Sequence, residues 1–322
     1  MHLVVYLPLL APVPAALGAR PLAESVEPRL ATWLLACGAL ALAVLSCAAL
    51  GVLAVAGLVR LPLAALVGGW SATLVRAGDP VSTVEAVLAG LVLTAAAATG
   101  ARLLWRRARA LAAAALEAAC LPGPDRLVVL DHPVPDAYAL PGLPGRIVVS
   151  TAMLDVLDEA DCEAMFAHER AHLACHHYAF VAAVHLAVAV NPLLRPAATA
   201  VAYTVERWAD ERAAAACGSR RQVARAVGKA ALATAHTPSA KSIRTDVMGF
   251  LGRGRRRDPL ASAGPVPRRV AALLAEPRSH LKLFNIPLLP LGAAAALIGT
   301  SALCAFAAAH ELHAILERAG LG

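Results

Sequence analysis

The sequence predicts a mainly α-helical integral membrane protein with about four transmembrane helices and a cytoplasmic α+β domain that contains a small β-sheet. The first observation is composition, because 59% of the 322 residues are hydrophobic and only 16% are charged. A mean hydropathy of +0.65 is too apolar for an ordinary soluble domain. The second observation is a set of long uncharged runs, and the third is a more polar central segment with short β-prone pieces.

The predicted N-terminal membrane region, residues 1–110, holds helices near 3–19, 31–59 and 84–104. The second run carries no charged residue and is long enough to span a bilayer with some tilt. The first run contains three prolines, so a signal peptide is the alternative there. It lacks the positively charged start that a signal peptide normally has, and an uncleaved helix fits the topology better.

The topology follows from arginines that flank the central segment. They come after the third span and before a fourth, which is predicted at 283–309 within the C-terminal region 281–322. Because positive residues favour the cytoplasmic side, the domain at 111–280 should face the cytosol, with residues 60–80 and the N-terminus outside. The arginines are Arg102, Arg106, Arg107, Arg109, Arg253, Arg255, Arg256, Arg257, Arg268 and Arg269.

The net charge of +7 does not indicate nucleic-acid binding. Aromatic residues make up only 4% of the chain, and the basic residues gather beside apolar runs instead of alternating with aromatics. Orientation in a lipid bilayer explains the charge better. The seven cysteines are an odd number, so no disulfide framework is implied, and reduced thiols facing the cytosol are the simplest interpretation.

The central segment changes character along its length. It opens with an alanine-rich helix, continues with the short β-prone pieces RLVVLD, DAYAL and GRIVVST between Pro/Gly turns, and is helical from Ala152 onward. The apolar run 178–196 raises the question of a fifth span. It is near the lower length limit for crossing a bilayer and holds His185, so a core or interfacial helix is favoured.

The stretch FAHERAHLACHH, residues 166–177, contains an HExxH motif. On a helix, His168 and His172 are one turn apart, about 40° around the axis, and can share one zinc ion. Glu169 lies at the edge of that face and could take a proton from water as general base, while zinc would lower the pKa of the water and polarise a scissile carbonyl. Chance occurrence of so short a motif is the alternative.

A second helical pattern, VERWADERAAAAC, supplies Glu206 as a third zinc ligand. Two histidines and one carboxylate leave an open position for water, which hydrolysis requires. Asp210 is one turn beyond Glu206 and could accept a hydrogen bond from a ligand imidazole, fixing its tautomer. A solvated charged helix whose residues pair locally is the alternative.

Three residues close to the motif are not expected to bind metal. Cys175 and His176 share nearly the same helix face as His172 but are a turn farther from His168, and three ligands plus water already complete a tetrahedral site. His177 is expected to face away, either solvated or capping a helix.

HERAH followed by ERWAD, and preceded by AYALPGLPGRIVVSTAML, resembles the BlaR/MecR-type membrane zinc metallopeptidases, which are related to the HtpX-like and CAAX-processing proteases. The resemblance covers about residues 125–275 and includes PRRVAALL. It implies a zincin-like metalloprotease domain with zinc on His168, His172 and Glu206, Glu169 as the catalytic base and Asp210 behind the ligands.

The sequence departs from the antibiotic sensors of that group in one respect. Only HELHAILERAGLG follows the last span, so an extracellular penicillin-binding sensor domain is expected to be missing. A signal would then have to arrive through the membrane helices, the short loops or a partner protein.

The strand before the motif helix has a possible second role. In zinc proteases of this general design, an edge strand beside the active-site helix binds the substrate backbone as an added strand. Ile147, Val148 and Val149 are therefore candidate substrate-binding residues, and an ordinary core strand is the alternative.

The sequence thus indicates a multi-pass zinc endopeptidase of the cell membrane that cleaves protein or peptide substrates at the cytoplasmic face. Regulated proteolysis, such as removal of a cytoplasmic transcriptional repressor, and quality control of membrane proteins both fit. A non-catalytic zinc-binding scaffold is the alternative of a different class, although a scaffold has no need of Glu169 between two ligands. A metal transporter is weaker, because the motifs lie outside the apolar spans.

Overall fold

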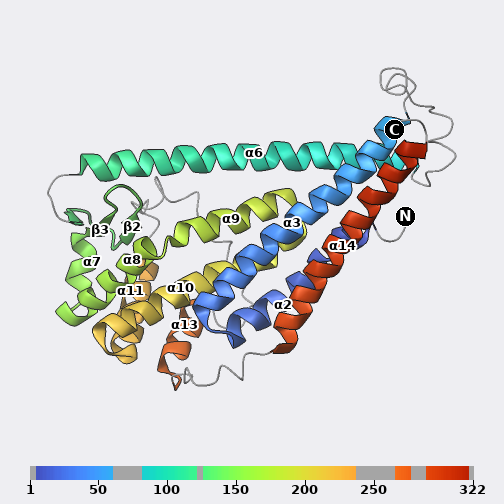
Figure 1. The fold of residues 1–322 in the computed structure, drawn as a ribbon. Coiled ribbons are helices and arrows are strands. Elements are labelled where there is room, and N and C mark those ends of the chain that lie inside the picture. The colour runs from blue at the N-terminus through green and yellow to red at the C-terminus, as the bar shows by residue number, and fades with distance from the viewer. Residues whose placement is uncertain (1–4, 61–81, 122–125, 237–264, 277–287, 319–322) are drawn as a thin grey trace. The chain divides into compact units, whose positions relative to one another are not determined.

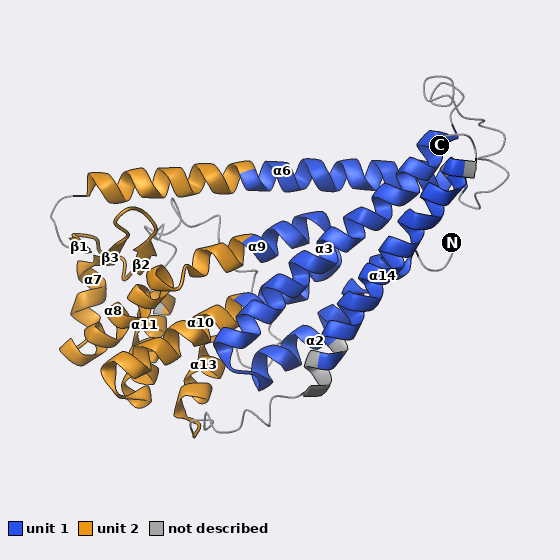
Figure 2. Ribbon diagram, viewed as in Figure 1, with its two compact units in different colours: residues 1–104, 183–201, 286–322 blue, residues 105–182, 202–285 orange. Residues whose placement is uncertain are grey.

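The protein is described from a computed structural model that covers residues 5–60, 82–121, 126–236, 265–276 and 288–318 (Figure 1). The chain divides into two compact units (Figure 2). One unit comprises residues 1–104, 183–201 and 286–322, and the other comprises residues 105–182 and 202–285. Three helices, α6, α9 and α10, contribute residues to both.

The first unit is built from helices. They are α1 (Leu7–Leu10), α2 (Pro12–Ser25), α3 (Pro28–Val59), the first part of α6 (Thr83–Cys120), the second part of α9 (His177–Val190), the short 3-10 turn η1 (Pro192–Leu194), the first part of α10 (Arg195–Cys217) and α14 (Leu288–Arg318).

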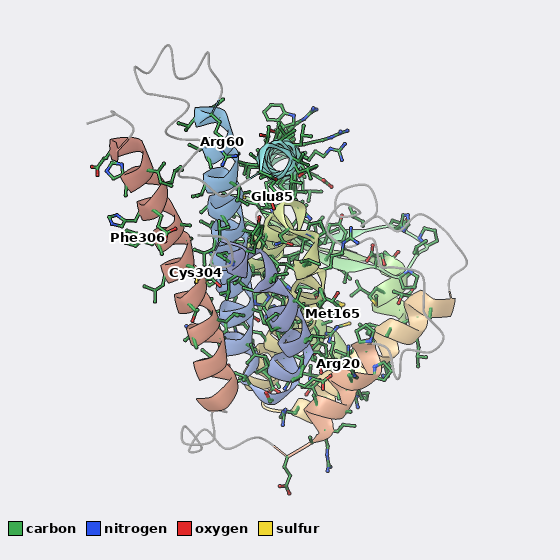
Figure 3. The ribbon with its side chains drawn as sticks, turned by 90° about the vertical axis from the view of Figure 1, so that its right-hand side faces the viewer. Arg20, Arg60, Glu85, Met165, Cys304 and Phe306 are labelled. Carbon is green, nitrogen blue, oxygen red and sulfur yellow. The ribbon has the colours of Figure 1, made fainter. Side chains whose placement is uncertain are left out.

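Three helices of the described chain are long and apolar enough to cross a membrane: α3, α6 and residues Ala294–Ile315 of α14. They also expose large apolar side chains, among them Phe306 of α14, which is 73% exposed (Figure 3). In water such exposure would be costly, but lipid tails match it. These helices suggest a membrane protein of mainly α class.

The predicted span at 3–19 is not among these three. Its described part forms two helices, α1 and α2, and Pro12 begins the second of them. Both contact α3, and Ser46 of α3 donates a hydrogen bond to the carbonyl of Pro8 at 3.2 Å. The total of four spans therefore stays a prediction, and the predicted outer loop at 60–80 lies almost wholly outside the described residues.

The apolar run that raised a fifth span forms α9, which has 14 residues. It follows α8 (Glu159–Ala174) at an angle of 57°, and only the two together have the length and composition of a span. The core or interfacial interpretation of α9 stays a prediction.

Small residues allow close contact between helices of the first unit. A cluster of alanines from α3, α6 and α14 includes Ala49, Ala56, Ala86 and Ala308. At Gly57 of α3 the approach is so close that an added Cβ would lie 2.2 Å from the Cβ of Ala86. Small-residue contacts of this kind are typical of helices that associate in membranes.

α6 begins with a reciprocal cap. The side chain of Glu85 accepts from the backbone N–H of Ser82 at 2.8 Å, and Ser82 Oγ accepts from the N–H of Glu85 at 3.2 Å, which is a capping box. The helix then continues without a break to Cys120. The predicted span at 84–104 and the predicted alanine-rich helix after it are therefore one helix.

Within its described residues, the second unit holds a three-stranded sheet and four complete helices. The strands are β1 (Leu127–Leu130), β2 (Ala137–Leu140) and β3 (Arg146–Ser150), and the helices are α7 (Thr151–Val156), α8, α11 (Arg220–His236) and α13 (Pro265–Leu274), besides parts of α6, α9 and α10.

β3 is the central strand of this sheet. The strand order is β1-β3-β2, with β1 parallel and β2 antiparallel to β3. Val148 packs with Tyr138 and Ala118 on one face, while Val149 packs with Met153 and Met165 on the other. The expectation that β3 is an edge strand was wrong, because both of its edges are hydrogen-bonded to neighbouring strands.

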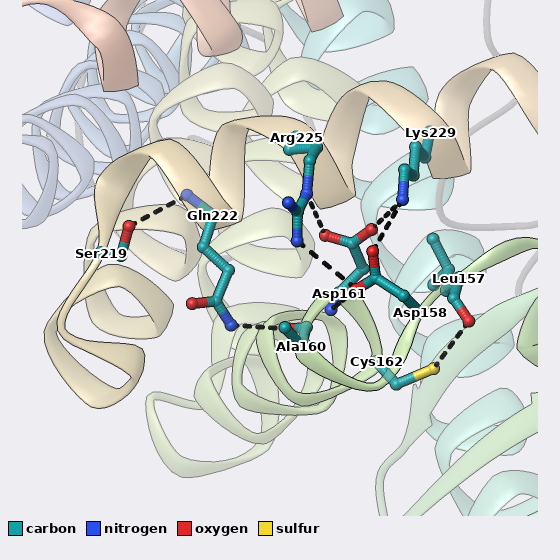
Figure 4. A network of polar contacts seen from close by, with 9 residues as sticks. All are labelled: Leu157, Asp158, Ala160, Asp161, Cys162, Ser219, Gln222, Arg225 and Lys229. Atoms are coloured by element: carbon teal, nitrogen blue, oxygen red, sulfur yellow. Dashed lines mark hydrogen bonds and ion pairs between the residues drawn. The ribbon is translucent and has the colours of Figure 1, made fainter.

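α8 carries the HExxH motif and is fixed at its N-terminus. Asp158 caps it by accepting from the N–H of Asp161 at 2.9 Å, which satisfies a backbone donor that has no partner within the helix. Arg225 and Lys229 of α11 bind the carboxylates of Asp158 and Asp161 (Figure 4). Alanines of α8, α10 and α11 pack together beyond this network, so α8 is held against both helices.

Candidate metal centre

His168 and His172 lie on one face of α8, as the motif predicts. Their Nε2 atoms are 3.1 Å apart, and the two rings meet edge to face with centroids 4.8 Å apart. His168 is 9% exposed and the side chain of His172 is 19% exposed, so the two rings are largely shielded from solvent.

Glu206 of α10 completes the group. Its Oε2 lies 3.6 Å from His168 Nε2 and its Oε1 lies 3.7 Å from His172 Nε2. These three residues offer ligand atoms that all lie within 4.8 Å of one another. Bonds of 2.0–2.1 Å in a tetrahedral zinc site put neighbouring ligand atoms about 3.3 Å apart. The three side chains therefore fit a zinc ion in donor type and in spacing.

Asp210 lies behind the first histidine. It is 1% exposed, and its Oδ1 is 3.0 Å from His168 Nδ1, the ring nitrogen on the far side from Glu206. A carboxylate in this place holds a ligand imidazole in one tautomer and one orientation. The structure thus brings Asp210 beside His168 Nδ1, and its role behind a zinc ligand stays a prediction.

Arg269 of α13 also contacts this group, a role that no motif in the sequence indicates. Its Nε and Nη2 bind the two oxygens of Asp210 at 2.8 and 2.7 Å, and its Nη1 lies 2.8 Å from Glu206 Oε2. Its side chain is 11% exposed. One guanidinium therefore orients both carboxylates, which the planar donor fork of arginine allows.

The sequence pattern assigns the two arginines of α13, Arg268 and Arg269, to membrane orientation. Arg269 instead pairs inside the site, and the guanidinium of Arg268 lies over the ring of Tyr203 at 4.5 Å from its centroid. Arg253, Arg255, Arg256 and Arg257 lie outside the described residues. The arginines that still support the predicted orientation are the exposed ones on α6, Arg102, Arg106 and Arg109.

Burial and charge pairing oppose each other in this site. Burial alone would lower the pKa of His168, but the contacts with Asp210 and Glu206 outweigh it and raise the pKa to about 10. Burial would raise the pKa of Glu206 and of Asp210, yet Arg269 and His168 hold both below their ordinary values. Both carboxylates are therefore ionised at neutral pH. Their negative charge favours a cation beside the Nε2 atoms of the two histidines.

Glu169 follows His168 directly in α8 and is partly exposed. It is near enough to Arg269 to contribute, after Asp210 and Glu206, to the raised pKa of that arginine. A carboxylate beside the ligand group and open to water is placed to exchange a proton with a bound water molecule.

The residues after the motif depart from a continuous helix. α8 ends at Ala174, with Cys175 as its C-cap, and His176 has a φ of 50°, in the left-handed region. The candidate group of His168, His172 and Glu206 does not include Cys175 or His176, and the expectation that neither binds metal stays a prediction. His177 does not face away, however. It is 1% exposed, and its Nδ1 lies 3.0 Å from His172 Nδ1.

The three predicted substrate-binding residues are buried in the central strand. Ile147, Val148 and Val149 are 3%, 1% and 0% exposed. Ile147 also lines a cavity of about 890 Å³, together with Phe166 and Leu173, but neither valine does, and none of the three ligand residues does. A role for these three residues in binding substrate stays a prediction without an edge strand to support it.

The segment from the end of α6 through the motif can be compared with known families. Residues 100–194 match the family model of peptidase family M48. The matched segment includes His168, Glu169 and His172 and ends before Glu206 and Asp210, which the structure brings to the same place. The match supports a metallopeptidase of the M48 type, a class that typically uses zinc, and hence a protein or peptide substrate. Among curated proteins and solved structures, none matches the chain.

Proposed function

We propose that the protein is a membrane-embedded zinc endopeptidase that hydrolyses peptide bonds of protein substrates at the cytoplasmic face. The observation that carries this proposal is the group of His168, His172 and Glu206, whose ligand atoms lie within 4.8 Å of one another, with Glu169 beside it. The M48 match of residues 100–194 supports the reaction class. The exposed arginines of α6 support the cytoplasmic orientation.

Each residue of the site has a separate task in this proposal. A zinc ion on the three ligands would supply Lewis-acid chemistry to a water molecule and to the scissile carbonyl. Glu169 accepts a proton from the attacking water at its carboxylate and returns it to the leaving amine. Asp210 orients His168, and Arg269 fixes the carboxylates of Asp210 and Glu206 so that they do not reorient during the reaction.

The biological role is the finer part of the proposal. A BlaR/MecR-type peptidase would act by removing a cytoplasmic repressor. A quality-control peptidase would instead take many membrane proteins as substrates. The same site serves both roles, so the choice depends on the substrate and not on the chemistry.

The experiment compares proteolysis by the detergent-purified wild type and by Glu169→Gln, on casein and on the protein itself, with zinc content measured for each. Glu163→Gln is a matched control, because it makes the same change at an exposed position of the same helix. We expect about one zinc per chain in all three proteins and cleavage by the wild type and the control only. Zinc binding by all three with cleavage by none would favour the non-catalytic scaffold.

A further inference from the structure

The two histidines of the motif share one arrangement. Each has its Nε2 near Glu206 and its Nδ1 near another buried side chain. For His168 that side chain is Asp210, at 3.0 Å. For His172 it is His177, with 3.0 Å between the two Nδ1 atoms. His172 therefore has a partner at its Nδ1, as His168 does, but the partner of His172 is an imidazole and that of His168 is a carboxylate.

The tautomers of His172 and His177 decide which ring donates the hydrogen bond between them. When Nε2 of His172 gives its lone pair to a metal ion, the ring proton is on Nδ1, which then donates. His177 can accept at Nδ1 only if its own proton is on Nε2. That Nε2 is buried and has no hydrogen-bond partner within the described chain. The fold thus leaves one buried N–H group unpaired while it directs Nδ1 toward His172.

The surroundings of His177 hold its ring in this orientation. The side chain is 1% exposed, and its ring packs on Trp208 of α10 with centroids 4.7 Å apart. The rings of His172 and His177 are nearly perpendicular, at 88°, so a ring nitrogen of one meets the edge of the other. A buried polar atom without a partner calls for a physical explanation, and the contact of the other ring nitrogen with His172 supplies one here.

We propose that His177 is a positioning residue that accepts the Nδ1–H of His172 and keeps its Nε2 directed at the zinc ion. The inference rests on the proposed function, because it assigns a partner to one of the proposed ligands. Partners of this kind fix the ring and raise the basicity of a ligand histidine, and their loss typically weakens metal binding by about 10- to 100-fold.

The test uses two variants of nearly equal shape, His177→Asn and His177→Leu. Asparagine can place an acceptor oxygen close to the position of Nδ1, whereas leucine has no acceptor. Zinc affinity is measured by competition with a chelator, and the visible spectrum of the cobalt-substituted protein reports the ligand geometry. We expect leucine to weaken zinc binding by about 10- to 100-fold and to alter the cobalt bands, and asparagine to stay within about threefold of the wild type.

The outcomes separate this inference from the proposed function. Absence of zinc binding by the wild type would overturn the proposed function. Tight binding by the wild type and equal affinity in both variants would overturn the role of His177 alone, and so would an equal loss in both, which indicates packing only. If the leucine variant does not fold, nitrogen-15 histidine spectra of the zinc-loaded wild type decide. His177 is expected as the Nε2–H tautomer, and the Nδ1–H tautomer would contradict the proposal.

Discussion

Nη1 of Arg269 lies 2.8 Å from Oε2 of Glu206, and the same guanidinium binds both oxygens of Asp210. Arg269 belongs to α13, while the two carboxylates belong to α10. A helix that supplies no metal ligand therefore fixes the orientation of the third proposed ligand. This contact makes the candidate metal centre depend on the docking of α13.

Replacing Arg269 by glutamine should destabilise the second unit. Removing one member of a buried ionic group leaves the remaining charges unpaired, which typically costs about 3–5 kcal/mol. Arg269→Lys should recover part of this loss, because it keeps the charge but not the two-pronged geometry. Chemical unfolding of the metal-free protein measures the effect. Arg268→Gln is the control, because it makes the same change at the neighbouring position of α13, where the guanidinium lies over the ring of Tyr203, a contact worth about 0.5–1 kcal/mol. Equal losses in the two glutamine variants would contradict the assignment.

The loss of folding stability at acid pH should depend on the carboxylate of Asp158. The backbone N–H of Asp161 and the side chain of Lys229 lower the pKa of Asp158 from 3.8 to about 2. The pKa of Asp158 in the folded protein lies below its value in the unfolded chain. The stabilisation that its ionised carboxylate gives to the fold is therefore complete above about pH 4 and is lost as the pH falls toward 2. Asp158→Asn should flatten the loss of stability in that window, yet asparagine still caps α8.

The measurement for Asp158 is the unfolding midpoint between pH 5 and pH 2, for the wild type and the variant. Asp155→Asn, at an exposed position of α7 with no ion pair among the described residues, is the matched control. If the slopes of the wild type and Asp158→Asn coincide in this window, the network of Figure 4 does not stabilise the fold through Asp158.

Gly57→Ala should weaken the contact between α3 and α6. The added Cβ would meet the Cβ of Ala86 at 2.2 Å, and overpacking of this kind costs about 1–3 kcal/mol. Gly90→Ala tests the same pair of helices without a clash, because its Cβ would lie 3.8 Å from that of Ala54. It should be neutral or stabilising, since alanine is the better helix former. Thermal unfolding in detergent compares the two, and a Gly57→Ala protein as stable as Gly90→Ala would contradict the close approach.

Sequence spacing predicted those parts of the site that depend on one helix at a time. The interval from His168 to His172 is one helical turn, and so is the interval from Glu206 to Asp210, so each pair shares a face wherever its helix lies. Arg269 could not be found in this way, because its role depends on how α13 packs against α10. Its place beside Arg268 made it resemble a membrane-flanking basic pair.

Two other features were beyond the sequence for physical reasons. β3 is last of the three strands in the chain but central in the sheet, because it pairs with β1 in parallel and with β2 in antiparallel orientation. Strand order is set by tertiary contacts and not by local pattern. His177 was placed by extending the helix of the motif, whereas α8 ends at Ala174.

The turn between α8 and α9 fixes the spacing between His172 and His177. His176 adopts a φ of 50°, which histidine, asparagine and glycine tolerate and β-branched residues do not. A valine at position 176 would shift the start of α9. It would thereby separate the rings of His172 and His177, although it touches neither of them. Inserting or deleting one residue between Leu173 and His177 would have the same result. The contact between His172 and His177, which lie five residues apart, therefore depends on the backbone conformation of this turn as much as on the identity of the two side chains.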